Sequence, residues 1–582
     1  MRQNGSIRSG AGASQPPVRW TLAGASPRSV RRRAACLALV AGVLLGVPGA
    51  AAQSPARTAP GSDRGWDRLV ELNEELIALR QTRRDEGVPR FGPAAVAARA
   101  DAVEEIHARL QALDPSAWSV SGKVDYLLVW ARANALTFEH RVTRPWSTDP
   151  LLYLDQVQRV PYVDLPVEGG EAERWRASLR AVPTTLAQAR DNLTEANGEL
   201  ADLALFHLSN FDGVGQGQPY RDEPPEGTIG WYRDLCDRLA SEQPNDLEAC
   251  RAALDAVEGY RDWLQARRPQ MPASAGIGTD NLEWYFRNVR LLPWGVDEIA
   301  LLGEREFHRF RTAYEIVRNR DRGLPPLPLT TSAEEHEART REAERQILEM
   351  IREQELLTLP DDLPEAFDTD VFWSPRALTD RHFWEEIQFR NALNNHIHAS
   401  VPGHRFDGRL ARSVDNPIRS GYGDSSRAEG WATYIEEMFV LAGLTDDVPQ
   451  AEELFYVALM KRASRIYAEA KMHSGEFGLD EANRYMIDYV PYMEPDLGRY
   501  DLAGYLRRPG SGSGYIIGKI QLEELLSERA LEMGPEFDLG AFHDDVLGRG
   551  MIPLTLIRWE MTGATDEVAP LWLEATGEAL GR

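Results

Sequence analysis

The sequence is short of cysteines, of basic side chains and of alternating polar and apolar runs. Its 582 residues include three cysteines, and 90 acidic residues outnumber 65 basic ones to give a net charge of −25. A surface of this charge repels nucleic acids and anionic lipids, so we expect no nucleic-acid partner. With 43% apolar residues the chain still has enough hydrophobic material for a large core.

A long apolar run occurs near the N-terminus. It reads AACLALVAGVLLGV, follows Arg31, Arg32 and Arg33, and leads into PGAAAQ. The run is too short to span a bilayer comfortably. With small residues at Ala50 and Ala52, residues 1–52 are typical of a cleaved signal peptide. We therefore expect an exported protein, periplasmic or extracellular, with no stable membrane span after cleavage.

Two alternatives for the leader concern the export route and lipidation. The adjacent arginines favour twin-arginine export, but the bulky residues expected just after the pair are missing. Cys36 precedes the apolar run instead of following it, which argues against a lipoprotein. After cleavage only Cys236 and Cys250 remain. In an oxidising compartment they either form a local disulfide or stay as two buried thiols, and the sequence leaves both open.

Helical periodicity dominates the rest of the chain. Apolar residues recur at spacings of three and four, which predicts a mainly α fold. The predicted helical stretches are residues 66–81, 93–113, 124–142, 172–208, 228–267, 295–320 and 333–356. The best candidate for β-type alternation is residues 281–292. Prolines and polar residues at 321–332 mark a boundary, so we expect a flexible linker at 53–65, an N-terminal helical part at 66–320 and a C-terminal helical part at 333–577.

A set of metal-binding side chains lies in the C-terminal part. His398 and His404 are six residues apart, a spacing that would place them on different faces of one unbroken helix. Pro402 and Gly403 lie between them and allow the chain to break and turn back. Glu429 follows in a predicted helix, and two histidines with one glutamate suit Zn²⁺ with a fourth position left open. The spacing alone leaves open that these histidines are packing or surface residues.

Four motifs extend the set and resemble a known family. They are HASVPGH, EGWATYIEE, RPGSGSGYIIGK and FDLGAFHDDVLGRGMIPL, in this order. They resemble the bacterial family catalogued as domain of unknown function 885, whose usual forms are HExxPGHH, EGWALYxE, PGQAxSYxxG and FDxxxFHDxxLxxGxxPL. That family is similar to helical zinc peptidases related to carboxypeptidase Taq and angiotensin-converting enzyme. The resemblance implies a large multi-helix, zincin-like metallopeptidase architecture with a deep central cleft and little β structure.

The resemblance also implies roles for individual residues. One zinc ion would be held by His398, His404 and Glu429. Tyr515 would donate a hydrogen bond to the tetrahedral intermediate, and His543 would polarise the substrate from the same cleft. Seven residues after Glu429, Glu436 lies on the same helical face and is expected to orient a ligand histidine.

Substrate contacts are expected on a helix that the family packs beside the site. This helix matches RASRIYAEAKMH, so Arg465 and His473 are candidate substrate-binding residues. The alternative for Arg465 is a surface salt bridge. Arg405, directly after His404, is a third candidate because a guanidinium binds a carboxylate through two hydrogen bonds.

Three departures from the family pattern cluster at the predicted site. The family's glutamate after the first histidine is Ala399 here, its second histidine of PGHH is Arg405, and its glutamine of PGQ is Ser511. That glutamate moves protons during hydrolysis, and such participation is commonly worth about 10² to 10⁴ in rate. The candidate substitutes are Glu436, Glu437, Asp407 and His396, and for His396 a solvent-facing position on the helix is the favoured alternative.

The sequence therefore supports two hypotheses. The first is an exported, zinc-dependent hydrolase of peptide bonds, acting on a peptide or small amide, with weak or altered activity. The second is an inactive pseudopeptidase that binds peptides or a protein partner in the cleft. The sequence leaves the oligomeric state open.

Overall fold

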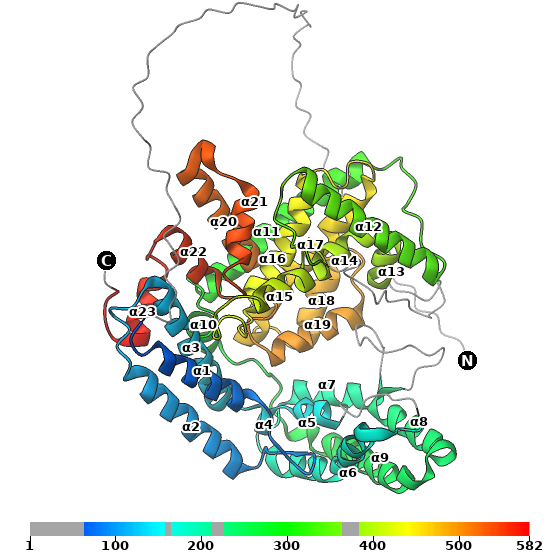
Figure 1. Cartoon of the computed structure of the whole chain (residues 1–582). Helices are drawn as coiled ribbons and strands as arrows, with labels where there is room; N and C mark the ends of the chain where they lie inside the picture. The colour runs from blue at the N-terminus through cyan, green and yellow to red at the C-terminus, as the bar shows by residue number, and fades with distance from the viewer. Residues whose placement is uncertain (1–62, 158–164, 211–225, 364–382, 581–582) are drawn as a thin grey trace, which may run out of the picture. The chain divides into compact units, whose positions relative to one another are not determined.

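The computed structural model describes residues 63–157, 165–210, 226–363 and 383–580, which are mainly helical (Figure 1). The predicted mainly α class is confirmed. The predicted signal peptide at 1–52, and the predicted linker except for its last three residues, lie outside the described residues. No helix within the described ranges is both long and apolar enough to cross a membrane.

The first half of the chain forms helices α1 to α12 and two short strands. The helices are α1 (Trp66–Arg80), α2 (Pro93–Gln111), α3 (Val120–Phe138), α4 (Pro145–Thr148), α5 (Pro150–Val157), α6 (Gly169–Asn192), α7 (Gly198–Ser209), α8 (Gly227–Glu242), α9 (Leu247–Arg267), α10 (Thr279–Asn288), α11 (Val296–Arg320) and α12 (Ala333–Glu353). Short π and 3₁₀ segments are η2 (Glu139–Thr143), η3 (Pro244–Asp246) and η4 (Arg268–Gln270). Strands β1 (Arg84–Asp85) and β2 (Val88–Pro89) pair antiparallel.

The second half contributes helices α13 to α23. They are α13 (Phe383–Arg390), α14 (Ala392–Ala399), α15 (His404–Arg412), α16 (Ser425–Leu441), α17 (Gln450–Ser474), α18 (Leu479–Tyr489), α19 (Pro495–Arg507), α20 (Gly514–Met533), α21 (Leu539–Leu547), α22 (Leu554–Thr562) and α23 (Val568–Thr576), with the 3₁₀ segment η6 (Gly534–Glu536) before α21.

Residues 281–292, the best candidate for β-type alternation, are helical over most of their length. They lie largely in α10, where Leu282 and Phe286 are buried. These two residues are four positions apart and therefore share one helix face, so packing decides the conformation of this segment.

Two hydrophobic core clusters share two helices. The first is built mainly from α5 to α11 and α17 to α19, and the second mainly from α1 to α3, α12, α14 to α16 and α21 to α23. Helices α17 and α20 contribute residues to both clusters, and the final helix α23 packs against α3 (Figure 1). Both clusters combine residues from before and after the proline-rich segment 321–332, and α17 and α20 carry candidate site residues.

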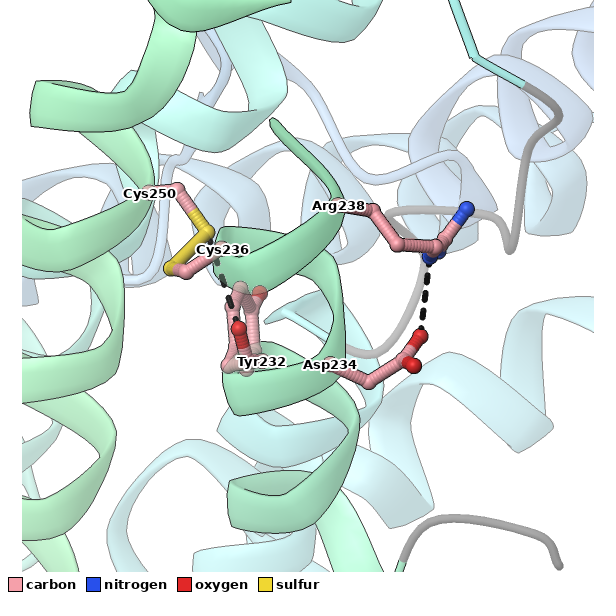
Figure 2. The surroundings of a disulfide bond; sticks show 5 residues. All are labelled: Tyr232, Asp234, Cys236, Arg238 and Cys250. Atoms are coloured by element: carbon pink, nitrogen blue, oxygen red, sulfur yellow. Dashed lines mark hydrogen bonds and ion pairs between the residues drawn. A yellow bond between two sulfur atoms is a disulfide. The ribbon is translucent and has the colours of Figure 1, made fainter. Parts of the chain in front are cut away.

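Cys236 and Cys250 form a disulfide (Figure 2). It joins α8 to α9, and both cysteines are buried in the first core cluster. The Cys250 sulfur lies 3.6 Å from the main-chain oxygen of Tyr232 on α8. Of the two states that the sequence left open, the structure has the bonded one.

We expect the double substitution Cys236→Ala/Cys250→Ala to lower the free energy of unfolding by about 2 to 4 kcal/mol, because the unfolded chain loses a cross-link. Urea unfolding of both proteins measures this difference. As a control, dithiothreitol should destabilise the natural protein and leave the double variant unchanged. Equal stability of the natural protein and the double variant, both measured without dithiothreitol, would contradict the expectation.

Candidate metal centre

The chain breaks between the two candidate histidine ligands. Helix α14 ends at Ala399, and α15 begins at His404. A Cβ atom on Gly403 would lie 2.0 Å from the main-chain oxygen of His398, so no side chain fits there. The indole Nε1 of Trp431 donates a hydrogen bond of 2.8 Å to the Pro402 oxygen and ties the turn to α16. The predicted break at Pro402 and Gly403 is therefore present.

His398, His404 and Glu429 converge on one point. His398 Nε2 lies 3.4 Å from Glu429 Oε2, and His404 Nε2 lies 3.3 Å from the same oxygen. One donor atom from each residue lies within 4.8 Å of the other two. Glu429 Oε2 is buried, and beyond these two contacts it forms no hydrogen bond of normal geometry with a described residue. Although burial acts to raise the pKa of Glu429, the two imidazoles hold it well below its ordinary value.

Glu436 fixes the orientation of His398. Its Oε1 lies 2.7 Å from His398 Nδ1, which leaves Nε2 facing Glu429. The other oxygen, Oε2, accepts hydrogen bonds from Arg462 Nη1 at 2.6 Å and from Asn394 Nδ2 at 3.1 Å. Glu436 is fully buried, and burial acts to raise its pKa, but Arg462 and His398 lower it below the ordinary value. Glu436 is therefore a charged residue that holds His398 in place.

The acids that could replace the absent glutamate are held in ion pairs. Glu437 binds Arg309 at 2.7 Å and Lys519 at 2.7 Å. Asp407 is fully buried and binds Arg427 at 3.1 Å through both carboxylate oxygens. Like Glu436, these carboxylates already have cationic partners, so none of the three is a free proton acceptor beside the candidate ligands.

The fourth candidate substitute, His396, has a different environment from the one its position suggested. The sequence favoured a solvent-facing side chain, whereas the structure leaves His396 2% exposed. Its Nε2 lies 3.1 Å from Glu344 on α12. The His396 side chain therefore packs toward α12. His398, two residues later on the same helix, is the histidine that Glu436 contacts.

Tyr515 lies beside His398, and Arg465 lies against Tyr515. The Tyr515 ring is parallel to the His398 ring, with 6.5 Å between the centroids. The Arg465 guanidinium carbon lies 4.7 Å from the centre of the Tyr515 ring. Arg465 also forms a 2.7 Å ion pair with Asp501, and this pair is buried, in contrast to the surface salt bridge considered from the sequence. Burial raises the pKa of Tyr515, so its hydroxyl stays protonated and can donate a hydrogen bond.

Three other predicted site residues have different surroundings. Arg405 is exposed on α15. His543 is fully buried behind α16, where its Nδ1 lies 2.6 Å from the Leu356 oxygen and its Nε2 lies 2.9 Å from the Tyr434 hydroxyl. His473 is also fully buried, with Nε2 3.3 Å from the Tyr505 oxygen, and burial lowers the pKa of His473 to about 4. The ring nitrogens of both histidines thus contact residues other than the three candidate ligands.

Sequence reasoning missed a close helix crossing that positions Tyr515 against Glu429. A Cβ atom on Gly518 of α20 would lie 1.9 Å from the Ser426 oxygen, and one on Gly430 of α16 would lie 2.4 Å from the Gly518 main chain. Only glycines allow the two backbones to approach this closely. Gly430 directly follows Glu429 in the motif EGWATYIEE, and Gly518 follows Tyr515 by three residues in RPGSGSGYIIGK. These positions beside two candidate site residues were the signal in the sequence that could have revealed the crossing.

Glu469 on α17 was also missed, and it anchors the loop before α20. Its carboxylate accepts main-chain hydrogen bonds from Gly512 at 3.1 Å and from Ser513 at 2.8 Å. Tyr515 follows two residues later, so this anchor fixes the start of its helix. Glu469 is 1% exposed, and burial raises the pKa of Glu469 to about 7.

We expect Glu469→Gln to change how stability depends on pH. From the ordinary pKa of 4.5 up to about 7, the folded protein holds a proton on Glu469 that the unfolded chain releases. This group's contribution to stability therefore falls as pH rises through that window. Urea unfolding across the window should show the variant gaining up to about 3 kcal/mol relative to the natural protein. The exposed Glu74→Gln is the control, and an unchanged pH slope in Glu469→Gln would refute the expectation.

Comparisons with known proteins give a family and a fold. No curated protein matches the chain. A "putative lipoprotein of unknown function" from Shewanella oneidensis aligns with a TM-score of 0.66 and 16% identity, covering 85% of this chain and 99% of that one. A "putative lipoprotein" from Colwellia psychrerythraea aligns with a TM-score of 0.63 and 14% identity, covering 85% and 98%. The profile described as "Bacterial protein of unknown function (DUF885)" matches residues 76–371 and 369–561, and the chain belongs to this family.

Proposed function

We propose that the protein is an exported, zinc-dependent hydrolase of peptide bonds whose activity is weak because Ala399 replaces the expected proton acceptor. The observation that carries the proposal is the convergence of His398, His404 and Glu429. A peptide or small amide is the proposed substrate.

The donor set fits a zinc ion in chemistry and in spacing. Zinc bonds of about 2.0 to 2.2 Å place the donors of a tetrahedral site about 3.3 to 3.6 Å apart. The two nitrogen–oxygen separations of 3.4 and 3.3 Å agree with this spacing. Among the described residues, none forms a hydrogen bond of normal geometry with the buried Glu429 Oε2, and a cation between it and the two imidazole nitrogens would interact with all three donors. When bound, zinc would polarise a substrate carbonyl and acidify a coordinated water.

The surrounding residues would orient the substrate and the ligands. Glu436 keeps His398 Nδ1 engaged, so Nε2 faces the centre. The Tyr515 hydroxyl would donate a hydrogen bond to the oxyanion that develops as the amide is attacked. Arg465, held by Asp501 against the Tyr515 ring, supports the position of that tyrosine.

Because residue 399 is an alanine, the proposed site lacks the side chain that would carry out proton transfer. The Ala399 side chain cannot accept a proton, and Glu436, Glu437 and Asp407 are held by arginines. Slow turnover follows, because general acid–base participation commonly contributes about 10² to 10⁴ in rate. The same observation favours the second candidate function, in which the site binds peptides without cleaving them.

Export is proposed from the N-terminal sequence. Three arginines, the apolar run and the small residues before position 53 form the pattern of a cleaved signal. The description of two structurally similar proteins as lipoproteins agrees with an exported location.

We expect the purified protein to bind one zinc ion per chain and Glu429→Gln to lose it. Glu436→Gln keeps every candidate ligand but frees His398, so it should weaken zinc binding about 10-fold to 100-fold. Elemental analysis and competition with a chelator measure these effects. The exposed Glu74→Gln should bind zinc as the natural protein does. A natural protein with no more zinc than Glu429→Gln would refute the metal centre.

We expect Ala399→Glu to raise the rate of peptide hydrolysis by about 10²-fold or more, because it supplies the absent proton acceptor. A mixture of fluorogenic peptides measures the rate. The matched control is Ala399→Gln, which has a similar size and no carboxylate. Equal rates for the two variants, with zinc bound in both, would argue against hydrolysis and for the peptide-binding alternative.

A further inference from the structure

The structure has a cavity whose lining residues do not include the candidate metal ligands. Its volume is about 800 Å³, within the range of about 300 to 1,000 Å³ that is common for small-molecule sites. Its walls come from four segments, which are residues 141–149, residues 193–200, residues 267–281 and the end of α19 at Leu506 and Arg507.

The charged side chains of this cavity are mostly cationic. Four arginines line it against two acids, Asp149 and Glu195, which leaves an excess of 4 − 2 = 2 positive charges. Arg144 binds Glu195 through two hydrogen bonds of 2.6 and 2.7 Å. Arg507 binds Asp149 at 2.7 Å. The lining acids are therefore already used by two of the four arginines.

The remaining two, Arg141 and Arg267, have no carboxylate within ion-pair distance among the described residues. Each lies against a tryptophan instead. The Arg141 guanidinium carbon is 4.8 Å from the centre of the Trp284 ring, and that of Arg267 is 5.4 Å from the Trp263 ring. A guanidinium that stacks on a ring keeps its in-plane N–H groups free for an anion. In a chain of net charge −25, this places two available cations at one cavity.

The cavity also has an apolar wall. The apolar side chains that line it include Leu193, Leu200, Met271, Ile277 and Leu506. A small inorganic anion would leave this surface in contact with water, whereas an apolar group on the ligand would cover it and gain about 25 cal/mol per Å² buried.

We propose that this cavity binds a small organic carboxylate that carries an apolar group. The carboxylate pairs with Arg141 and Arg267, and the apolar group lies against the leucine and isoleucine side chains. The site needs no metal and is independent of the proposed hydrolysis.

Binding of N-acetylphenylalanine, measured by calorimetry, tests the proposal. We expect its uncharged amide to bind at least tenfold more weakly, and inorganic phosphate to bind more weakly than the acid. Arg141→Gln/Arg267→Gln should weaken binding of the acid at least tenfold. The control Arg180→Gln/Arg352→Gln removes two exposed arginines outside the cavity and should change the affinity less than twofold.

A second variant tests the location without changing charge. Thr194 is exposed and lines the cavity, so Thr194→Trp should fill it and abolish binding of the acid. Circular dichroism confirms that each variant is folded. The proposal is overturned if acid and amide bind alike, if phosphate binds as tightly as the acid, or if the double variant and Thr194→Trp bind as the natural protein does. That last result would place the ligand elsewhere, for example at the candidate metal centre.

Discussion

The buried carboxylate of Glu436 is the interaction on which the candidate centre depends. It is fully buried, so its charge is tolerated only because Arg462, Asn394 and His398 surround it. These partners come from two helices, α17 for Arg462 and α14 for Asn394 and His398, while Glu436 itself lies on α16. One charged group therefore sets the relative position of these helices and the orientation of the first candidate ligand.

Much of the fold could be predicted from the sequence, because apolar spacing of three and four directly reflects burial of one helix face. The predicted stretches at 66–81, 93–113 and 295–320 agree with α1, α2 and α11 within a few residues. The segment 281–292 was ambiguous, because a short apolar run fits two periods and only the core decides between them. The pairing of Cys236 with Cys250 was undecided for a related reason, since it requires α8 and α9 to lie side by side.

Some features of the candidate site could also be predicted from the sequence, and others could not. The break before His404 follows from Pro402 and Gly403, whose backbone properties are local. The contacts of Arg462 and Glu469 were not predicted, although both residues lie within the stretch RASRIYAEAKMH, because each contact joins segments far apart in the chain. His543 illustrates the opposite case. Its motif suggested a place near the candidate ligands, yet both ring nitrogens contact Leu356 and Tyr434, and motif order carries no information on which side of α16 a residue lies.

Ligand binding and proton transfer are separable at this centre. The side chains that would hold zinc and orient the substrate depend on α14, α15, α16 and α20, and all of their mutual contacts are present without a carboxylate at position 399. In the proposed function, proton transfer would depend on that single position, because the three candidate acids are paired with Arg309, Arg427 and Arg462. Burial raises the pKa of Asp407 despite Arg427, whereas the cationic partners of Glu436 and Glu437 outweigh burial and lower their pKa values. In all three cases an arginine occupies the carboxylate. In the proposed function, position 399, at the end of α14 beside His398, is therefore the place where a single residue would decide between binding and turnover.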